Sequence, residues 1–338
     1  MRDVVVIGTG RYLPERVVTN AELVAELQKL DPTTNEQWII ERTGVRERHV
    51  AAPGEHTSDM ALEASCECLR KAGVDPKEID LIVVPTVSGD TIYPATANWL
   101  QGKLENDRAR SFDVNAGCSG FIYGLDVVTA LVRSRRSNLA LLVGAEKMSA
   151  LYDPADRTSY PLAGDGAACV LLRGVELSEN PERYGIHGFY TKSDGQMAHL
   201  LIQPLGGTSQ PLTRENIDNP ERYLRMDGKT VYQHAVRRMS ESVVRVLEQV
   251  RVEKEAVDWF IGHQANGRIL QAVAKKLEVP QEKVYTNIDR YANTTSVTIP
   301  LCLDELAESG QLQPGQKVVL FTFGTGFTWG ACYLVWGS

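Results

Sequence analysis

The stretch Ser111-Phe112-Asp113-Val114-Asn115-Ala116-Gly117-Cys118-Ser119-Gly120 decides the fold, because a β-prone run ends there in small residues. Apolar residues at helical spacing follow it, namely Phe121, Leu125, Val128 and Leu131. A cysteine at a strand-to-helix junction lies near unpaired backbone N–H groups and the positive end of a helix dipole. Both favour the thiolate over a thiol of ordinary pKa, ~8.5, so Cys118 is a candidate nucleophile. The alternative is a small buried core residue.

Composition limits the classes of function. The 338 residues are 43% hydrophobic and carry a net charge of −7, which argues against non-specific nucleic-acid binding. No apolar run approaches the ~20 residues that cross a bilayer, and the first residues read as a buried strand. The six cysteines lack zinc-type spacing and fit reduced thiols. We therefore expect a cytoplasmic protein without a metal, nucleic-acid or membrane partner.

The chain repeats itself once, in diverged form. The segment 73–84 has a counterpart in 251–262, and each follows an amphipathic stretch and enters an apolar strand. Likewise 138–144 is echoed by 317–323, and the order of the matches is kept. A repeat this long is no solenoid. It predicts two similar α/β halves, 1–182 and 183–338, with strands and helices that alternate.

The duplication gives Cys118 a counterpart. Residues 113–118 map near 289–294, another strand-to-helix turn that contains Asn293, and His263 ends the repeated strand 259–262. Ligands of open α/β sheets bind at the carboxyl ends of strands. We therefore expect Cys118, His263 and Asn293 to converge in one cleft between the halves.

The region 184–228 connects the halves and is rich in Gly, Pro, Asn and Asp with weak periodicity. Long irregular segments of compact folds often form lids or binding loops. A surface loop without a binding role is nearly as good an interpretation of this region.

Several segments together resemble one family. They are Asn115-Ala116-Gly117-Cys118-Ser119-Gly120-Phe121, His263-Gln264-Ala265-Asn266, Tyr291-Ala292-Asn293-Thr294 and 324–330, with 38–49 and 164–168 in support. In this order they are similar to the signature segments of β-ketoacyl-acyl carrier protein synthase III. The resemblance implies an α/β thiolase-like fold, in which two duplicated βαβαβαββ halves give a five-layered αβαβα architecture.

The resemblance also implies an acyltransferase that starts fatty acid synthesis. A Cys118–His263–Asn293 triad would transfer an acyl group from acyl-CoA to malonyl-acyl carrier protein with loss of CO₂. The backbone N–H groups of Cys118, Thr325 and Gly326 would form the oxyanion hole. No cofactor beyond the coenzyme A thioester substrates is implied, and the family suggests a homodimer.

Binding residues follow from the same resemblance. Coenzyme A and its pantetheine arm would contact Trp38, Arg42, Arg157, Gly228 and Asn266, which otherwise read as ordinary surface, core or cap residues. An acidic acyl carrier protein would dock on Arg268, Lys275 and Lys276, which otherwise read as a solvated helix face.

Three positions depart from the family pattern or set its specificity. Thr325 replaces a frequent glycine and would be strained at a positive φ, and Gln233 replaces a basic docking residue. Tyr93 stands where a residue limits the acyl pocket across the dimer, which suggests a short primer.

Three other functions compete. A specialised relative would make a polyketide starter or transfer acyl groups to a non-malonyl acceptor. A cysteine hydrolase would use the same three residue types in the same chain order. A nucleotide-binding oxidoreductase is disfavoured, because Leu13 occupies the third glycine position after Gly8-Thr9-Gly10.

Overall fold

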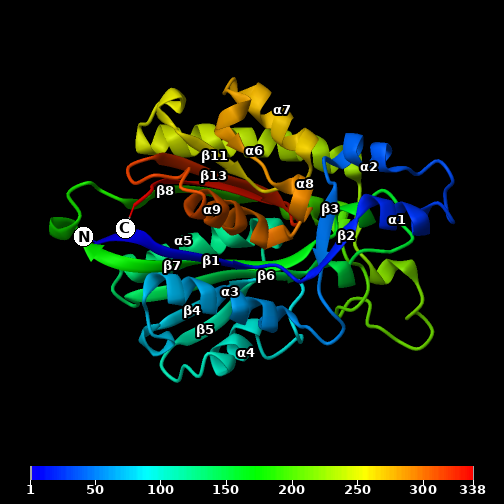
Figure 1. The fold of residues 1–338 in the computed structure, drawn as a ribbon, viewed down its shortest axis with the longest axis horizontal. Helices are drawn as coiled ribbons and strands as arrows, with labels where there is room; N and C mark the ends of the chain where they lie inside the picture. Colours follow the sequence, from blue (N-terminus) through cyan, green and yellow to red (C-terminus); the bar gives the residue numbers. More distant parts are fainter. Residues whose placement is uncertain (1, 338) are drawn as a thin grey trace.

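The computed structural model describes residues 2–337 as two five-stranded mixed sheets with helices on both faces of each (Figure 1). In spatial order, the first sheet contains β1 (Arg2–Tyr12), β7 (Asp165–Glu176), β6 (Leu139–Lys147), β4 (Leu81–Pro85) and β5 (Arg110–Val114). The second contains β8 (Gly185–Ser193), β14 (Thr328–Val335), β13 (Lys317–Gly324), β11 (Trp259–Gly262) and β12 (Val284–Tyr285). The two orders match strand for strand, as a duplication requires.

The helices form the remaining three layers. Helices α3 (Thr57–Ala72) and α4 (Thr96–Lys103) cover the outer face of the first sheet, and α6 (Gly228–Val250) and α7 (Gly267–Leu277) cover that of the second (Figure 1). Helices α5 (Gly120–Arg133) and α9 (Thr298–Glu308) lie between the sheets. The αβαβα architecture is confirmed, whereas the boundary at 182/183 stays a prediction.

Smaller elements complete the chain near one end of the sheets. They are β2 (Arg16–Thr19), α1 (Asn20–Leu27), α2 (Glu36–Thr43), β3 (Glu47–Val50), β9 (Leu201–Ile202), β10 (Arg225–Met226) and α8 (Ile288–Tyr291). Strands β2 and β3 pair antiparallel, and so do β9 and β10. Within residues 2–337, no helix is long and apolar enough to cross a membrane.

Helices α5 and α9 are apolar on both sides because they lie between the two sheets. Phe121, Ile122 and Leu125 of α5 and Ile299 and Leu303 of α9 belong to one buried cluster that includes strands of both sheets. Burial of such side chains stabilises the fold by ~1.5–3 kcal/mol each. This shared core fixes the two halves against each other, and with them the starts of α5 and α9.

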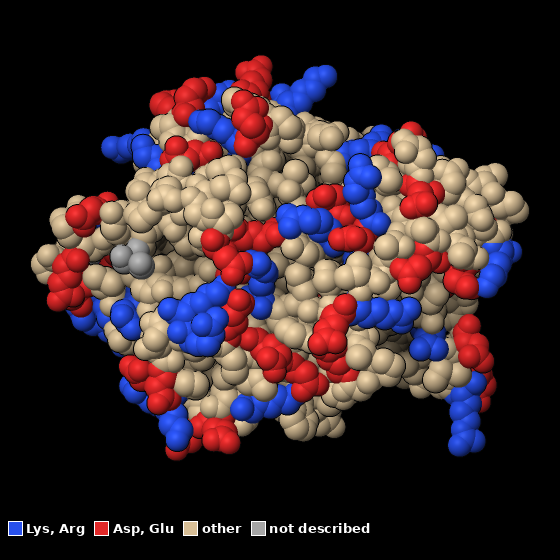
Figure 2. Space-filling view, in the orientation of Figure 1, with Lys and Arg blue, Asp and Glu red and all other residues tan. Residues whose placement is uncertain are grey.

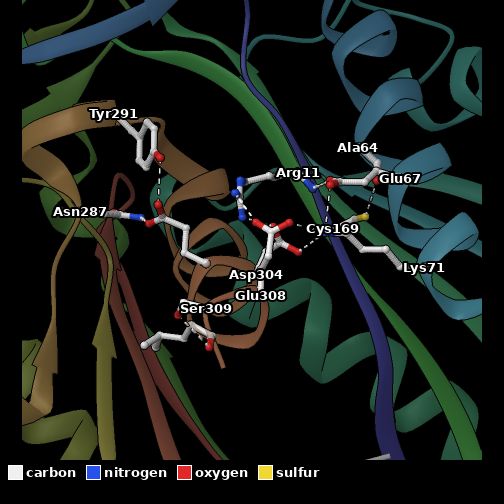
Figure 3. A network of polar contacts seen from close by, with 12 residues as sticks. Arg11, Ala64, Glu67, Lys71, Cys169, Asn287, Tyr291, Asp304, Glu308 and Ser309 are labelled. Carbon is white, nitrogen blue, oxygen red and sulfur yellow. Dashed lines mark hydrogen bonds and ion pairs between the residues drawn. The ribbon is translucent and has the colours of Figure 1, made fainter. Parts of the chain in front are cut away.

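Charged side chains anchor α9 to the first half. Arg11 of β1 lies 2.5 Å from both Asp304 and Glu308 of α9, and Lys71 of α3 reaches the same two carboxylates at 3.5 Å (Figure 3). Asp304 is fully buried, so its pairing with Arg11 compensates for the loss of hydration. The helix that follows the Asn293 turn is thus held by the opposite half of the molecule.

The region 184–228 is more ordered than the sequence suggests. Its first part is β8, a strand of nine residues that pairs with β14 and so closes the second sheet. The interpretation of the whole region as irregular is therefore wrong for 185–193. The strand was missed because only Gly185 and Ile186 of it are fully buried, which leaves little alternation to detect.

Candidate active site

Cys118 lies in a one-turn 3-10 helix, Gly117–Ser119, immediately before α5. Gly117 has φ +54, and a Cβ placed on it would come within 2.2 Å of Thr325 Cγ2. A Cβ on Gly324 would lie 2.7 Å from Cys118 N. Glycine at both positions is what allows the 324–326 loop to pack against the backbone of the cysteine.

Side chains of the second half fasten this turn. Thr322 Oγ1 donates to the carbonyl of Cys118 at 3.0 Å, and Thr328 Oγ1 lies 3.0 Å from the carbonyl of Ala116. Ser119 Oγ in turn donates to Thr328 O at 3.1 Å. The turn belongs to the first half in sequence but is held by the β13–β14 hairpin of the second.

Thr325 is not strained in the way that the sequence suggested. Its φ is not positive, whereas the next residue, Gly326, has φ +130. The Thr325 hydroxyl donates to Leu201 O at 2.5 Å and so ties the hairpin to β9. The threonine therefore adds an anchor to the loop, and the left-handed conformation falls on glycine.

His263 follows β11 and is only 1% exposed. Its Nδ1 lies 2.8 Å from Thr298 Oγ1 at the start of α9, while its Nε2 has no partner among residues 2–337. Burial lowers the pKa of this imidazole to about 3, so the ring is neutral at physiological pH. An unpartnered ring nitrogen at a cavity wall is free for a substrate or for a proton.

Asn293 lies in the turn between α8 and α9. Its Oδ1 accepts a hydrogen bond from Thr295 N at 2.9 Å, which fixes the amide so that Nδ2 is the free donor. The turn is strained, because Ala292 and Thr295 adopt positive φ values of 55 and 53. Glu305 of α9 clamps α8 through Tyr291 Oη at 2.9 Å and Arg290 at 2.6 Å.

The three side chains meet in one cavity. Cys118, His263 and Asn293 all line a space of about 850 Å³ between the two halves. Its walls also include residues of α6 on one side and, on the other, Met148, Leu151, Tyr152, Thr158 and Leu162. A cavity of this volume is large enough for a drug-sized small molecule.

The charge state of Cys118 differs from the sequence expectation. Although Cys118 is only half-buried, desolvation of its sulfur, together with the nearby carboxyl of Glu146, raises the pKa of the thiol to about 12. The expected depression of this pKa is therefore wrong for this structure, because the desolvation of a thiolate outweighs the help of neighbouring N–H groups. Cys118 rests as a neutral thiol and must lose its proton during attack.

Several predicted binding residues border the same cavity. They are Trp38, Arg42, Gly228, Asn266 and Arg268, and Thr325 of the predicted oxyanion hole and the departing residue Gln233 border it as well. Asn266 also caps α7, since its Oδ1 accepts from Arg268 N and its Nδ2 donates to Arg42 O at 2.8 Å. Arg157 lies outside the lining, but its guanidinium sits 4.7 Å from the Trp38 ring and pairs with Asp31 at 3.1 Å.

Other predicted residues lie away from the cavity. Lys275 and Lys276 are exposed in the last turn of α7, and Gly326 does not border the cavity. Tyr93 is 85% exposed on a surface loop. Figure 2 shows acidic and basic side chains interspersed over the visible face, without one dominant patch. Within residues 2–337 no cluster of His, Cys, Asp and Glu is arranged for a metal ion.

Sequence reasoning missed the residues that orient the triad, which are Thr298 for the imidazole, Thr295 for the amide and Glu305 for the asparagine turn. Thr295 and Thr298 lie two and five residues after Asn293 in the chain, so their proximity was a usable signal. Glu305 is recognisable only from the packing of α8 against α9.

Comparison with known proteins agrees with this geometry. Residues 112–195 match the model of 3-oxoacyl-[acyl-carrier-protein] synthase III, and residues 247–336 match its C-terminal model. A beta-ketoacyl-[acyl-carrier-protein] synthase III of Chlorobaculum tepidum is 40% identical over 97% of this chain and 98% of its own length.

Solved structures agree as well. The 3-oxoacyl-(acyl carrier protein) synthase III of Pseudomonas aeruginosa has a TM-score of 0.89 at 40% identity, with 100% of this chain and 99% of that chain covered. The Aquifex aeolicus synthase III has a TM-score of 0.88 at 36% identity, covering 99% and 100%.

Proposed function

Because this chain belongs to the 3-oxoacyl-[acyl-carrier-protein] synthase III family, we propose that it condenses an acyl-CoA primer with malonyl-acyl carrier protein. The reaction is a decarboxylative Claisen condensation that passes through acyl-Cys118 and yields a 3-oxoacyl-acyl carrier protein, the first step of fatty acid synthesis. The observation that carries the proposal is the convergence of Cys118, His263 and Asn293 on one cavity.

The first half reaction requires a base, since Cys118 rests as a thiol. Thr298 Oγ1 lies 3.1 Å from Thr295 O, and when its single proton is donated there, it accepts from His263 Nδ1–H. The unpartnered Nε2 then carries a lone pair and accepts the Cys118 proton as sulfur attacks the thioester carbon. The same proton passes to the coenzyme A sulfur when the C–S bond breaks.

The oxyanion of each tetrahedral intermediate needs N–H donors. We assign them to the backbone of Cys118 and of Thr325, because both residues border the cavity and Gly326 does not. Removal of one such donor costs about 10²–10³ in rate in a well-studied protease. The close packing of Gly324 on Cys118 N keeps the two donors together.

In the second half reaction, the malonyl C–C bond breaks and CO₂ leaves. The electron pair moves onto the thioester oxygen as an enolate, and Asn293 Nδ2 donates a hydrogen bond to it. His263 provides the second donor when Thr298 turns its hydroxyl proton toward Nδ1, which places the ring proton on Nε2. The enolate carbon then attacks acyl-Cys118, and the released thiolate regains a proton from water.

Coenzyme A would enter past Trp38. The guanidiniums of Arg42 and Arg157 lie 4.9 and 4.7 Å from the centre of this ring, so an adenine that stacks there takes the place of one of them. The displaced arginine is then available for the nucleotide phosphates. Gly228 and Asn266 border the path of the pantetheine arm toward Cys118.

The carrier protein would dock on α7. Arg268 is exposed at the cavity mouth, and Lys275 and Lys276 extend the basic surface along the same helix. We further propose that the protein is a cytoplasmic homodimer in which Tyr93 reaches the partner's acyl pocket. The chemistry would use no metal or redox cofactor. The 85% exposure of Tyr93 in one chain supports its availability for such a contact.

The test separates the two half reactions by intact-protein mass spectrometry. A panel of acyl-CoA thioesters should add one acyl group at Cys118, and later addition of malonyl-acyl carrier protein should remove it with release of CO₂ and formation of a 3-oxoacyl product. Acyl transfer to the carrier protein without CO₂ would contradict condensation. Rapid release of free acid would instead indicate a hydrolase.

A further inference from the structure

An apolar compartment forms one part of the catalytic cavity. It is built from a buried cluster and from partly buried side chains packed against it, which include Val87, Met148, Leu151, Tyr152, Ala163 and Leu224. All of these except Ala163 also line the catalytic cavity. We call this part the Tyr152 compartment. Its apolar walls suit the acyl chain of a thioester, and Tyr152 carries the one polar group of the set.

The ring of Tyr152 is a fixed part of this wall. Its backbone N donates to Met148 O at 3.3 Å, and the preceding carbonyl, Leu151 O, accepts from Leu224 N at 2.9 Å. The side chain is only 4% exposed and packs against Ala163, whose small size leaves room for an aromatic ring. The hydroxyl at the end of the ring is therefore held in place by packing.

The Tyr152 hydroxyl is free to bind a ligand. It makes no hydrogen bond within residues 2–337, and it is not among the fully buried polar atoms that lack a partner, so its oxygen keeps accessible surface. Because Tyr152 borders the catalytic cavity, that surface is available to a substrate there. An alkyl chain that displaced water from the compartment would leave this hydroxyl without a partner, which is costly.

The surroundings of the hydroxyl indicate which group it can bind. Burial, followed by the proximity of Cys118, Asp156 and Glu146, raises the pKa of this phenol well above its ordinary value. The hydroxyl therefore stays protonated at physiological pH and can donate a hydrogen bond. The two carboxyl groups disfavour a negative charge on the ligand, so the acceptor that suits this donor is a neutral oxygen.

We propose that Tyr152 selects acyl primers that carry a neutral oxygen, as a hydroxyl or keto group, close to the thioester carbonyl. The Tyr152 hydroxyl donates a hydrogen bond to this oxygen while the acyl group is transferred to Cys118. A purely alkyl primer leaves the same donor unpaired. This assignment rests on the proposed function, because it names the class of the acyl-CoA primer.

The first test compares primers that share a four-carbon chain: butyryl-CoA, both enantiomers of 3-hydroxybutyryl-CoA, acetoacetyl-CoA and succinyl-CoA. The rate of Cys118 acylation is measured by intact-protein mass spectrometry and divided by the rate of the same thioester with glutathione, which removes differences in intrinsic reactivity. We expect at least one neutral oxygenated primer to load at least about 10-fold faster than butyryl-CoA on this scale. Succinyl-CoA should load more slowly than that primer.

The second test removes the hydroxyl but keeps the ring. In Tyr152→Phe, the preference for the oxygenated primer over butyryl-CoA should fall at least about 10-fold. Tyr160→Phe is the matched control, because Tyr160 packs against the same cluster but borders a second cavity of about 500 Å³, beside α1, and not the catalytic one. The preference in Tyr160→Phe should equal that of the parent.

Two results would overturn the assignment of Tyr152. One is a parent that loads butyryl-CoA as fast as every oxygenated primer, and the other is an equal preference in the parent and Tyr152→Phe. Succinyl-CoA that loads fastest would overturn the choice of a neutral oxygen. A failure of the proposed function is distinguishable, since acyl-Cys118 that forms but releases no CO₂ with malonyl-acyl carrier protein would contradict condensation and leave the primer preference as measured.

Discussion

The two turns that meet at the active site precede the central helices α5 and α9 but are built differently. The Cys118 turn follows strand β5, whereas the Asn293 turn follows the short helix α8, so the expectation of a strand-to-helix turn at 289–294 is wrong. The turn at Cys118 relies on glycine, with Gly117 and Gly324 packed so closely that a Cβ on either would collide with a neighbour. The turn at Asn293 has no glycine and holds its strained backbone through hydrogen bonds, such as that from Thr295 N to Asn293 Oδ1. The first presents a nucleophile and backbone N–H groups, and the second presents a side-chain donor.

The comparison shows how two halves of the same fold acquire different chemical roles, because the turn in each half is stabilised in a different way. Close backbone packing serves the first turn, because an oxyanion hole needs N–H groups at fixed positions. Side-chain anchoring serves the second, because an amide that donates to an enolate must have its other end fixed. Thr298 connects the second turn to the catalytic histidine, since it starts α9 after Asn293 and contacts His263.

The largest expected effect comes from removal of the nucleophile. Cys118→Ala should abolish acyl loading and lower condensation at least ~1,000-fold, as for other nucleophile deletions. Intact-protein mass spectrometry after exposure to acyl-CoA gives the loading directly. Cys66→Ser is the control, since Cys66 is exposed and remote from the cavity. Loading that survives in Cys118→Ala would place the nucleophile elsewhere.

The pH dependence of Cys118 alkylation should also span orders of magnitude. A pKa raised to about 12 by burial means that each pH unit between 7 and 10 increases the thiolate fraction, and thus the rate with iodoacetamide, about 10-fold. The rate is followed by peptide mass spectrometry at Cys118. A plateau at or below pH 8 would show that the thiolate already predominates there.

Gly324→Ala tests the close packing of the first turn. The new Cβ would meet Cys118 N at 2.7 Å, so the loop must move and the oxyanion donors with it. We expect acyl loading to slow by about 10–100-fold, in line with the cost of a small misplacement in an active site. Gly102→Ala is the matched control, because a methyl group added there, in α4, would meet no neighbouring segment within 4 Å. Equal loading rates in the two variants would contradict the packing argument.

Ala292→Gly should have the smallest effect and tests the second turn. Glycine relieves the strain at φ 55, worth ~1–3 kcal/mol, but loses a buried methyl group and gains unfolded-state entropy. The free energy of unfolding in urea should therefore stay within about 1 kcal/mol of the parent. A loss above about 2 kcal/mol would show that the turn depends on this side chain more than on its hydrogen bonds.

Much of the site could be predicted from the sequence because chain order and duplication constrain it. Matched segments in the two halves place Cys118 and Asn293 before the central helices, and the end of a repeated strand places His263 beside them. The family resemblance is confirmed, and so is the layered architecture. Strand β8 was missed because most of it lacks the alternation of a half-buried strand.

Features that depend on three-dimensional packing could not be predicted. The pKa of Cys118 is set by desolvation and by Glu146, which lies in β6 and far away in the sequence, so local sequence indicated the wrong direction. The second cavity, beside α1, is lined by segments that run from β2 to residue 163 and carries no motif. The roles of Arg268, Lys275, Lys276 and Tyr93 involve other molecules and stay predictions.

The division of labour between the turns is tested most directly by Asn293→Ala in single turnover. The variant is loaded with an acyl group, its mass is recorded, and malonyl-acyl carrier protein is added. We predict loading within about 3-fold of the parent, followed by condensation and CO₂ release that are slower by about 10²–10³. Equal impairment of loading and condensation, or condensation at the parent's rate, would contradict the account.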